Sequence, residues 1–171
     1  MTAIPQAYLD TILPLIGKAR DFLENGETLS PIAFVGNFAT QQTTSVLIDS
    51  RDEETKDRSA RAVKHAAEST AADFIFMIME AWSLRKDKLH RHKEIMERYG
   101  SIGASPYKID IVSFSLETRH GVWVAEAPIK PKGYSTKKRT IGEVNFMHFN
   151  GAEGRFTGLL PGAGAAPVAL H

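Results

Sequence analysis

Three acidic residues are the strongest candidates for catalytic chemistry in this chain. Asp49 follows a short β-rich run, and Glu80 and Glu117 lie late in two further predicted strands. If those strand ends meet at one end of a sheet, the three carboxylates could hold a divalent cation for phosphodiester chemistry. Asp49 also fits the polar approach to a helix, and Glu117 fits a solvent-facing strand position. A metal-dependent phosphodiesterase or related hydrolase is therefore an alternative function.

Two basic segments stand out against a formal net charge of +1. Residues 85–100 contain six Lys and Arg against three Asp and Glu, and residues 130–139 contain five against none. Cations with an interleaved tyrosine fit phosphate backbones and a stacked base. Together they predict polyanion or nucleic-acid binding if they form one surface; the other interpretation is two solvated segments. The candidate residues are Lys86, Lys88, Arg91, Lys137, Lys138 and Arg139.

Other chemistries have little support in the sequence. There is no cysteine, so a disulfide, a thiolate ligand and a cysteine nucleophile are all excluded. His90 and His92 are two residues apart, whereas helical zinc pairs are three or four apart. Neither a phosphate-binding loop nor a Gly-x-Ser-x-Gly elbow is present. We therefore expect no metal site and no cofactor.

The elements of the first half are predicted from periodicity. Apolar residues at helical spacing predict a helix from about Pro5 to Asn25, which Pro14 should kink or split. Residues 31–35 and 45–48 read as a β-hairpin. Ser50 and Glu53 match a capping box and predict a helix start there, with the helix continuing to about residue 72. Residues 74–79 are apolar on both alternating faces, which indicates a central strand covered on both sides.

The second half is predicted to be mainly a hairpin. Residues 85–99 form a third, peripheral helix, and residues 108–129 form two strands joined at His120-Gly121. That turn places Val112 opposite Ile129 and Phe114 opposite Ala127, and it gathers the strongly apolar pairs on one face. Further strands are expected at 141–149 and 156–160.

The order of elements is therefore α-β-β-α-β-α-β-β-β-β. It predicts an α+β fold: one domain over residues 1–161, a mixed but mostly antiparallel sheet of about six or seven strands, and helices mainly on one face. Residues 162–171 read as a flexible Gly/Ala/Pro tail.

No secretory signal or membrane-spanning run is recognisable, so the sequence indicates a cytoplasmic protein without membrane contact. No motif carries a mechanism by itself. The leading functional interpretation is a binding or adaptor protein without catalysis, with a protein partner or a second copy of itself. The hydrolase and the polyanion-binding module remain alternatives.

Overall fold

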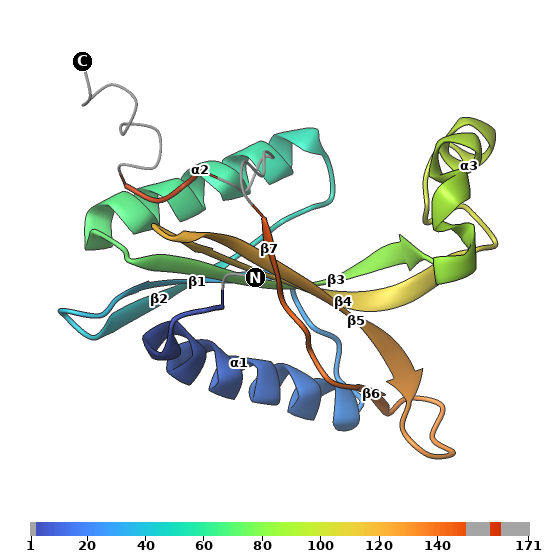
Figure 1. Ribbon diagram of the computed structural model, residues 1–171, viewed down its shortest axis with the longest axis horizontal. Coiled ribbons are helices and arrows are strands. Elements are labelled where there is room, and N and C mark those ends of the chain that lie inside the picture. The colour runs from blue at the N-terminus through green and yellow to red at the C-terminus, as the bar shows by residue number, and fades with distance from the viewer. Residues whose placement is uncertain (1–2, 150–157, 162–171) are drawn as a thin grey trace.

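The computed structural model describes residues 3–149 and 158–161 (Figure 1). The helices and strands alternate in the order predicted from the sequence, which confirms the α+β class. The elements are α1 (Gln6–Glu24), β1 (Ile32–Asn37), β2 (Gln42–Leu47), α2 (Glu53–Thr70), β3 (Phe74–Leu84), the 3₁₀ helix η1 (Lys86–Arg91), α3 (His92–Tyr99), β4 (Lys108–Thr118), β5 (Gly121–Pro131), β6 (Arg139–Ile141) and β7 (Met147–Phe149).

The strands form a single curled sheet. Its order is β2-β1-β3-β4-β5-β6, and β7 also pairs with β5. Every strand pair in the described residues is antiparallel. The sheet was expected to be mostly antiparallel, and the described pairs include no parallel one. The strand expected at 156–160 falls on residues of which only 158–160 are described, and these are not in a strand.

The two long helices lie on opposite faces of the sheet (Figure 1). α1 packs on the face that carries Phe76 and Phe114, whereas α2 packs on the face that carries Ile75 and Met77. The expectation that the helices gather on one face is therefore wrong. The physical reason for the observed arrangement lies in β3. Every residue from Phe74 to Ile78 is buried, so both faces of this strand must be covered.

α1 is one unbroken helix despite Pro14. Pro14 is exposed on the outer side of the helix, so the backbone carbonyl that it leaves without a helical donor faces water. The opposite side carries the residues that dock the helix on the sheet, which are Tyr8, Ile12, Ile16, Ala19 and Leu23. The predicted split of the helix at Pro14 is therefore wrong.

The β4–β5 hairpin has the predicted faces but a different register. Phe114 pairs with Ala125, and Thr118 pairs with Gly121, so each partner lies two residues closer to the turn than expected. The turn residues are Arg119 and His120. A shift of two residues preserves the faces because side chains alternate with period two. Phe114 and Ala125 are accordingly buried together.

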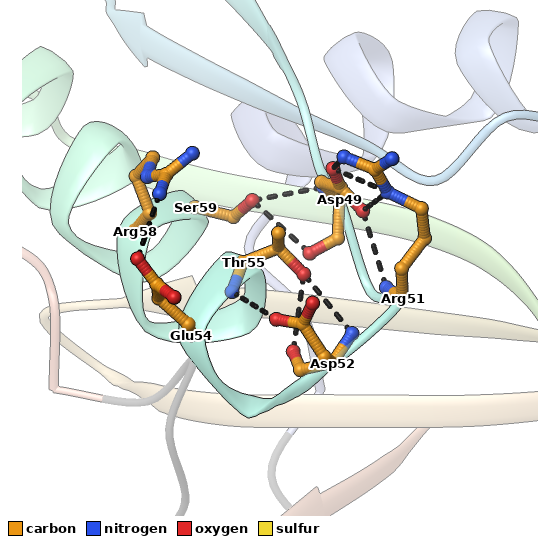
Figure 2. A network of polar contacts seen from close by, with 7 residues as sticks. All are labelled: Asp49, Arg51, Asp52, Glu54, Thr55, Arg58 and Ser59. Atoms are coloured by element: carbon orange, nitrogen blue, oxygen red, sulfur yellow. Dashed lines mark hydrogen bonds and ion pairs between the residues drawn. The ribbon is translucent and has the colours of Figure 1, made fainter.

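The start of α2 is capped by Asp52, not by Ser50 (Figure 2). The Thr55 amide donates to the Asp52 carboxylate at 2.7 Å, and the Asp52 amide donates to the Thr55 hydroxyl at 3.1 Å. Upstream, the amide of Asp49 donates to the Ser59 hydroxyl at 2.8 Å, which ties this segment to the helix. The predicted Ser50–Glu53 box is thus wrong by two residues.

Replacing Asp52 with Ala is expected to lower the free energy of unfolding by about 1 kcal/mol, because one amide at the helix start loses its acceptor. Ser50→Ala is the matched control and should change it by less than about 0.5 kcal/mol. Urea unfolding of the two variants measures both values. Equal losses would contradict the assignment of the cap to Asp52.

Candidate binding groove

A groove of about 250 Å³ lies between α1 and the β1–β2 hairpin. One wall is α1, the floor comes from β1, β2 and β3, and residues 28–30 complete the lining. Most of the lining is apolar, with Leu15, Ala19 and Phe22 from the helix and Ile32, Phe34 and Leu47 from the strands.

The position of α1 on the sheet leaves this groove open. The buried side of α1 packs with residues of β3, β4 and β5, and the helix also contacts β6. Ile32 and Phe34 of β1 reach only the margin of that core and are partly buried. The end of the sheet formed by β1 and β2 is therefore incompletely covered on the α1 side.

Two large apolar side chains at the groove are exposed. Leu47 of β2 is 70% exposed and Phe22 of α1 is 48% exposed. Burying a side chain of this size is worth about 1.5–3 kcal/mol, so the fold gains little from either residue as it stands. An apolar groove with exposed aliphatic and aromatic residues is the kind of surface at which proteins bind partners.

Lys18 is the only charged residue in the lining of the groove. It is exposed, and no ion pair or hydrogen bond of its side chain is found within the described residues. The other polar side chains of the lining are the hydroxyls of Thr28 and Ser30. The groove therefore combines an apolar floor with one cation that has no partner in the described chain.

A second, polar hollow of about 350 Å³ adjoins the groove, because both are lined by Ser30 and Leu47. It contains Asp49 and Arg51, whose side chains form an exposed ion pair (Figure 2). Hydrogen bonds from the Arg51 guanidinium lower the pKa of Asp49 to about 2. Leu47 thus lies between the apolar groove and the polar hollow.

The three candidate catalytic carboxylates do not come together. Asp49 is held by Arg51 at the end of β2. Glu80 lies on the α1 face of β3, where it accepts hydrogen bonds from the Arg139 guanidinium at 2.8 Å and the Leu29 amide at 3.4 Å. Glu117 pairs across the sheet with Ile75 on the opposite face. Within the described residues no group of three or more His, Cys, Asp or Glu could hold a metal ion.

Glu117 is buried, although the sequence suggested a solvent-facing position. It accepts a hydrogen bond from the Leu159 amide at 3.4 Å, and Leu159 and Leu160 cover this part of the α2 face. Burial raises the pKa of Glu117, and hydrogen bonds from the backbone of residues 158–160 oppose the rise only in part. The burial of Glu117 depends on residues 158–160, which are far from it in the sequence. No local sequence pattern could therefore predict it.

The raised pKa of Glu117 predicts a specific pH dependence. A folded-state pKa above the unfolded one means that the folded protein binds this proton more tightly. The contribution of Glu117 to stability therefore improves as the pH falls through its folded pKa, and it levels off below the unfolded value. Glu117→Gln cannot titrate, so we expect wild type to gain stability relative to this variant between neutral pH and pH of about 4.

Urea unfolding of both proteins over that pH range measures the difference in their free energies of unfolding. Contributions of the other carboxylates are common to both proteins and cancel in this difference. This comparison is needed because the pKa values of Asp49, Asp52, Asp87 and Glu94 are lowered by their partners and act in the opposite direction. Parallel pH profiles for wild type and variant would contradict the prediction.

Two of the six candidate polyanion-binding residues are in ion pairs. Arg91 pairs with Glu94 at 2.7 Å, and Arg139 pairs with Glu80 at 2.8 Å. Lys88 lies over the Tyr107 ring at 5.1 Å from its centroid. Lys86, Lys88, Lys137 and Lys138 have no acidic partner at ion-pair distance in the part of the chain that the structure describes.

The two basic segments lie on opposite sides of the sheet. Residues 85–99, expected as one helix, form η1 followed by α3, with Ile95 as the buried contact of α3. Figure 1 shows α3 on the side of α2 and the loop between β5 and β6 on the side of α1. A single cationic surface is therefore not formed, and polyanion binding remains a prediction that rests on each segment separately.

The sequence contained a partial signal for the groove. Leu15 and Phe22 widen the apolar stripe of α1 beyond its buried centre, and Thr43, Thr44 and Ser45 make β2 polar where a central strand would be apolar. Together they indicate an edge strand beside a helix with spare apolar surface. The helix and the strand had to be placed in space before Leu47 could be recognised as part of this surface.

None of the helices in the described part of the chain has the length and apolar character of a membrane span. No protein-family model matches the chain, no curated protein matches it, and no solved structure matches it.

Proposed function

We propose that this protein works by binding another protein, and that a segment of that partner lies in the groove beside α1. The observation that carries the proposal is the pair of exposed apolar side chains, Phe22 and Leu47, on a groove that the described residues leave uncovered. Removing apolar surface from water against a partner favours formation of a complex. A partner side chain between these residues would bury both of them.

The shape of the site favours an elongated occupant. The apolar groove and the polar hollow meet at Leu47 and Ser30, so a ligand that covers Leu47 touches both. A polypeptide segment can place an apolar side chain on one side of Leu47 and polar groups near Asp49 and Arg51 on the other. Apolar anchors surrounded by polar contacts are typical of protein interfaces.

A selection from a phage-displayed library of random peptides tests this function. Peptides selected on the wild-type protein should lose at least about tenfold in affinity for Leu47→Ser and for Phe22→Ser, which corresponds to about 1.4 kcal/mol. Leu13→Ser is the matched control, because Leu13 is 54% exposed on the same helix but does not line the groove. If no selected peptide depends on the groove residues, the proposed function is wrong.

The alternatives have less support. The hydrolase requires convergent carboxylates, but Glu80 and Glu117 lie on opposite faces of the sheet. The polyanion-binding module was predicted to use the two basic segments as one surface, but they lie on opposite sides of the sheet (Figure 1).

A further inference from the structure

β2 is an edge strand of the described sheet, and alternate residues along it direct backbone groups away from β1. The Ile48 amide donates to the Pro31 carbonyl at 2.9 Å, which identifies the hydrogen-bonded positions of this antiparallel pair. Every second residue before Ile48 also bonds to β1. The residues between them, Thr43, Ser45 and Leu47, therefore turn their amides and carbonyls to the open edge.

The same three residues place their side chains on the face of the groove. Leu47 pairs with Ile32 and Ser45 pairs with Phe34, and both β1 partners pack against the α1 core. A strand added to β2 would continue this pattern, with every second side chain above the groove. Backbone pairing and apolar contact are thus available to one extended ligand at the same time.

The edge of β2 lacks the usual protection against pairing. Exposed edge strands commonly carry lysine, proline or an inward-pointing charge, which discourage the addition of another strand. Residues 42–47, Gln-Thr-Thr-Ser-Val-Leu, contain none of these. Strand addition to such an edge is a common mode of peptide recognition, in which backbone hydrogen bonds supply affinity and side-chain pockets supply specificity.

Lys18 defines the charge that the ligand should carry. It is the only charged residue of the groove lining, and no acidic side chain in the described residues pairs with it. An acidic residue of the ligand would complement it beside apolar surface, where water screens less than in bulk.

We propose that the partner contributes an extended segment that adds to β2 as a further strand, with an apolar side chain between Leu47 and Phe22 and a carboxylate at Lys18. This inference rests on the proposed function and specifies how its site is used. β2 of a second copy would bring no carboxylate to Lys18, because residues 42–47 contain no acidic residue, so we assign the site to a different protein with an apolar and acidic segment.

Ser45→Pro tests strand addition, with Ser45→Ala as the matched control. The proline removes an amide that faces the open edge and that the β1–β2 ladder does not use, so the fold should persist. We expect the groove-dependent peptides to lose at least about tenfold in affinity for Ser45→Pro and to bind Ser45→Ala normally. Thermal melts of both variants verify that the proline variant is folded.

N-methylation of the peptide gives a second measurement that does not depend on the folding of any variant. Methylating one backbone amide at a time should weaken binding at every second position, because only alternate amides of an added strand face β2. Groove-dependent peptides that tolerate both Ser45→Pro and every N-methylation would overturn strand addition while leaving the proposed function intact.

Lys18→Gln tests the charge of the ligand. We expect it to lower affinity several-fold for peptides with an acidic residue, but to leave unchanged the affinity of the same peptides with that residue as its amide. Lys64→Gln, on an exposed position of α2, is the control. Equal effects on acidic and amide peptides would overturn the assignment of the carboxylate to Lys18.

Sedimentation of the free protein addresses the other occupant of the edge. A concentration-dependent dimer that Ser45→Pro abolishes would mean that β2 pairs with β2 of a second copy, and it would overturn the assignment to a different protein. A monomer over the same concentrations supports that assignment.

Discussion

Replacing Phe114 with Ala is expected to lower the free energy of unfolding by about 3–5 kcal/mol, as for other fully buried aromatic residues. Phe114 has no exposed surface, and its ring stacks on that of Phe76 with centroids 6.2 Å apart. The ring of Phe146, from the segment before β7, packs on it in a T-shaped arrangement, with centroids 6.4 Å apart. Its truncation leaves a cavity in the core between α1 and the sheet. Urea unfolding monitored by circular dichroism measures the loss.

Ser115→Ala is the control for this prediction. Ser115 is the next residue of β4, so its side chain lies on the other face of the sheet, where it is only partly buried. It should change the free energy of unfolding by less than about 0.5 kcal/mol. Equal effects of the two substitutions would show that the faces of β4 are misassigned.

Replacing Gly36 with Ala should cost about 1–3 kcal/mol, because the core at this position is already full. Gly36 is a buried residue of β1 that pairs with Phe74, and a Cβ built on it would collide with the Phe74 ring. Phe74 is itself buried and packs against Tyr8 and Phe38, so its ring has little room to move.

Gly17→Ala is the matched control for Gly36→Ala. Gly17 lies inside α1, and a Cβ there would meet no atom within 4 Å. Alanine should therefore stabilise the protein by up to about 1 kcal/mol, because glycine is a poor helix former. Thermal or urea unfolding of the two variants should show shifts of opposite sign. A loss at Gly17 comparable to that at Gly36 would contradict this explanation.

Local patterns in the sequence predicted the elements, and long-range geometry decided how they are used. The alternation of apolar and polar residues in 108–129 was sufficient to predict the two faces of the hairpin. It did not fix the turn, because a turn at 119–120 and one at 120–121 fit the alternation almost equally. The pairing of the two strands differs by two residues between these turns. The capping pattern found in the sequence began at Ser50, whereas in the structure Asp52 and Thr55 form the capping box of α2.

For the candidate sites, too, the sequence predicted local features but not the long-range arrangement. The sequence placed Glu80 and Glu117 late in strands. The face of the sheet on which each side chain lies depends on its odd or even position along the strand and on how the strands pair. Arg139 was predicted as a polyanion-binding residue, and its contact with Glu80 joins residues 59 positions apart in the chain. The groove depends on the placement of α1 over β3 to β5, which no local pattern contains.

The insertion of β1 between β2 and β3 has a consequence for the order of folding. β4 and β5 are joined by a short turn and can pair locally, whereas β1 must pair with β3 across the whole length of β2 and α2. Closing the longer loop costs more conformational entropy before any contact offsets it. The β1–β2 hairpin is thus expected to join a sheet that β3, β4 and β5 have already begun. The proposed binding groove, which β1 and β2 help to line, would then be completed late in folding.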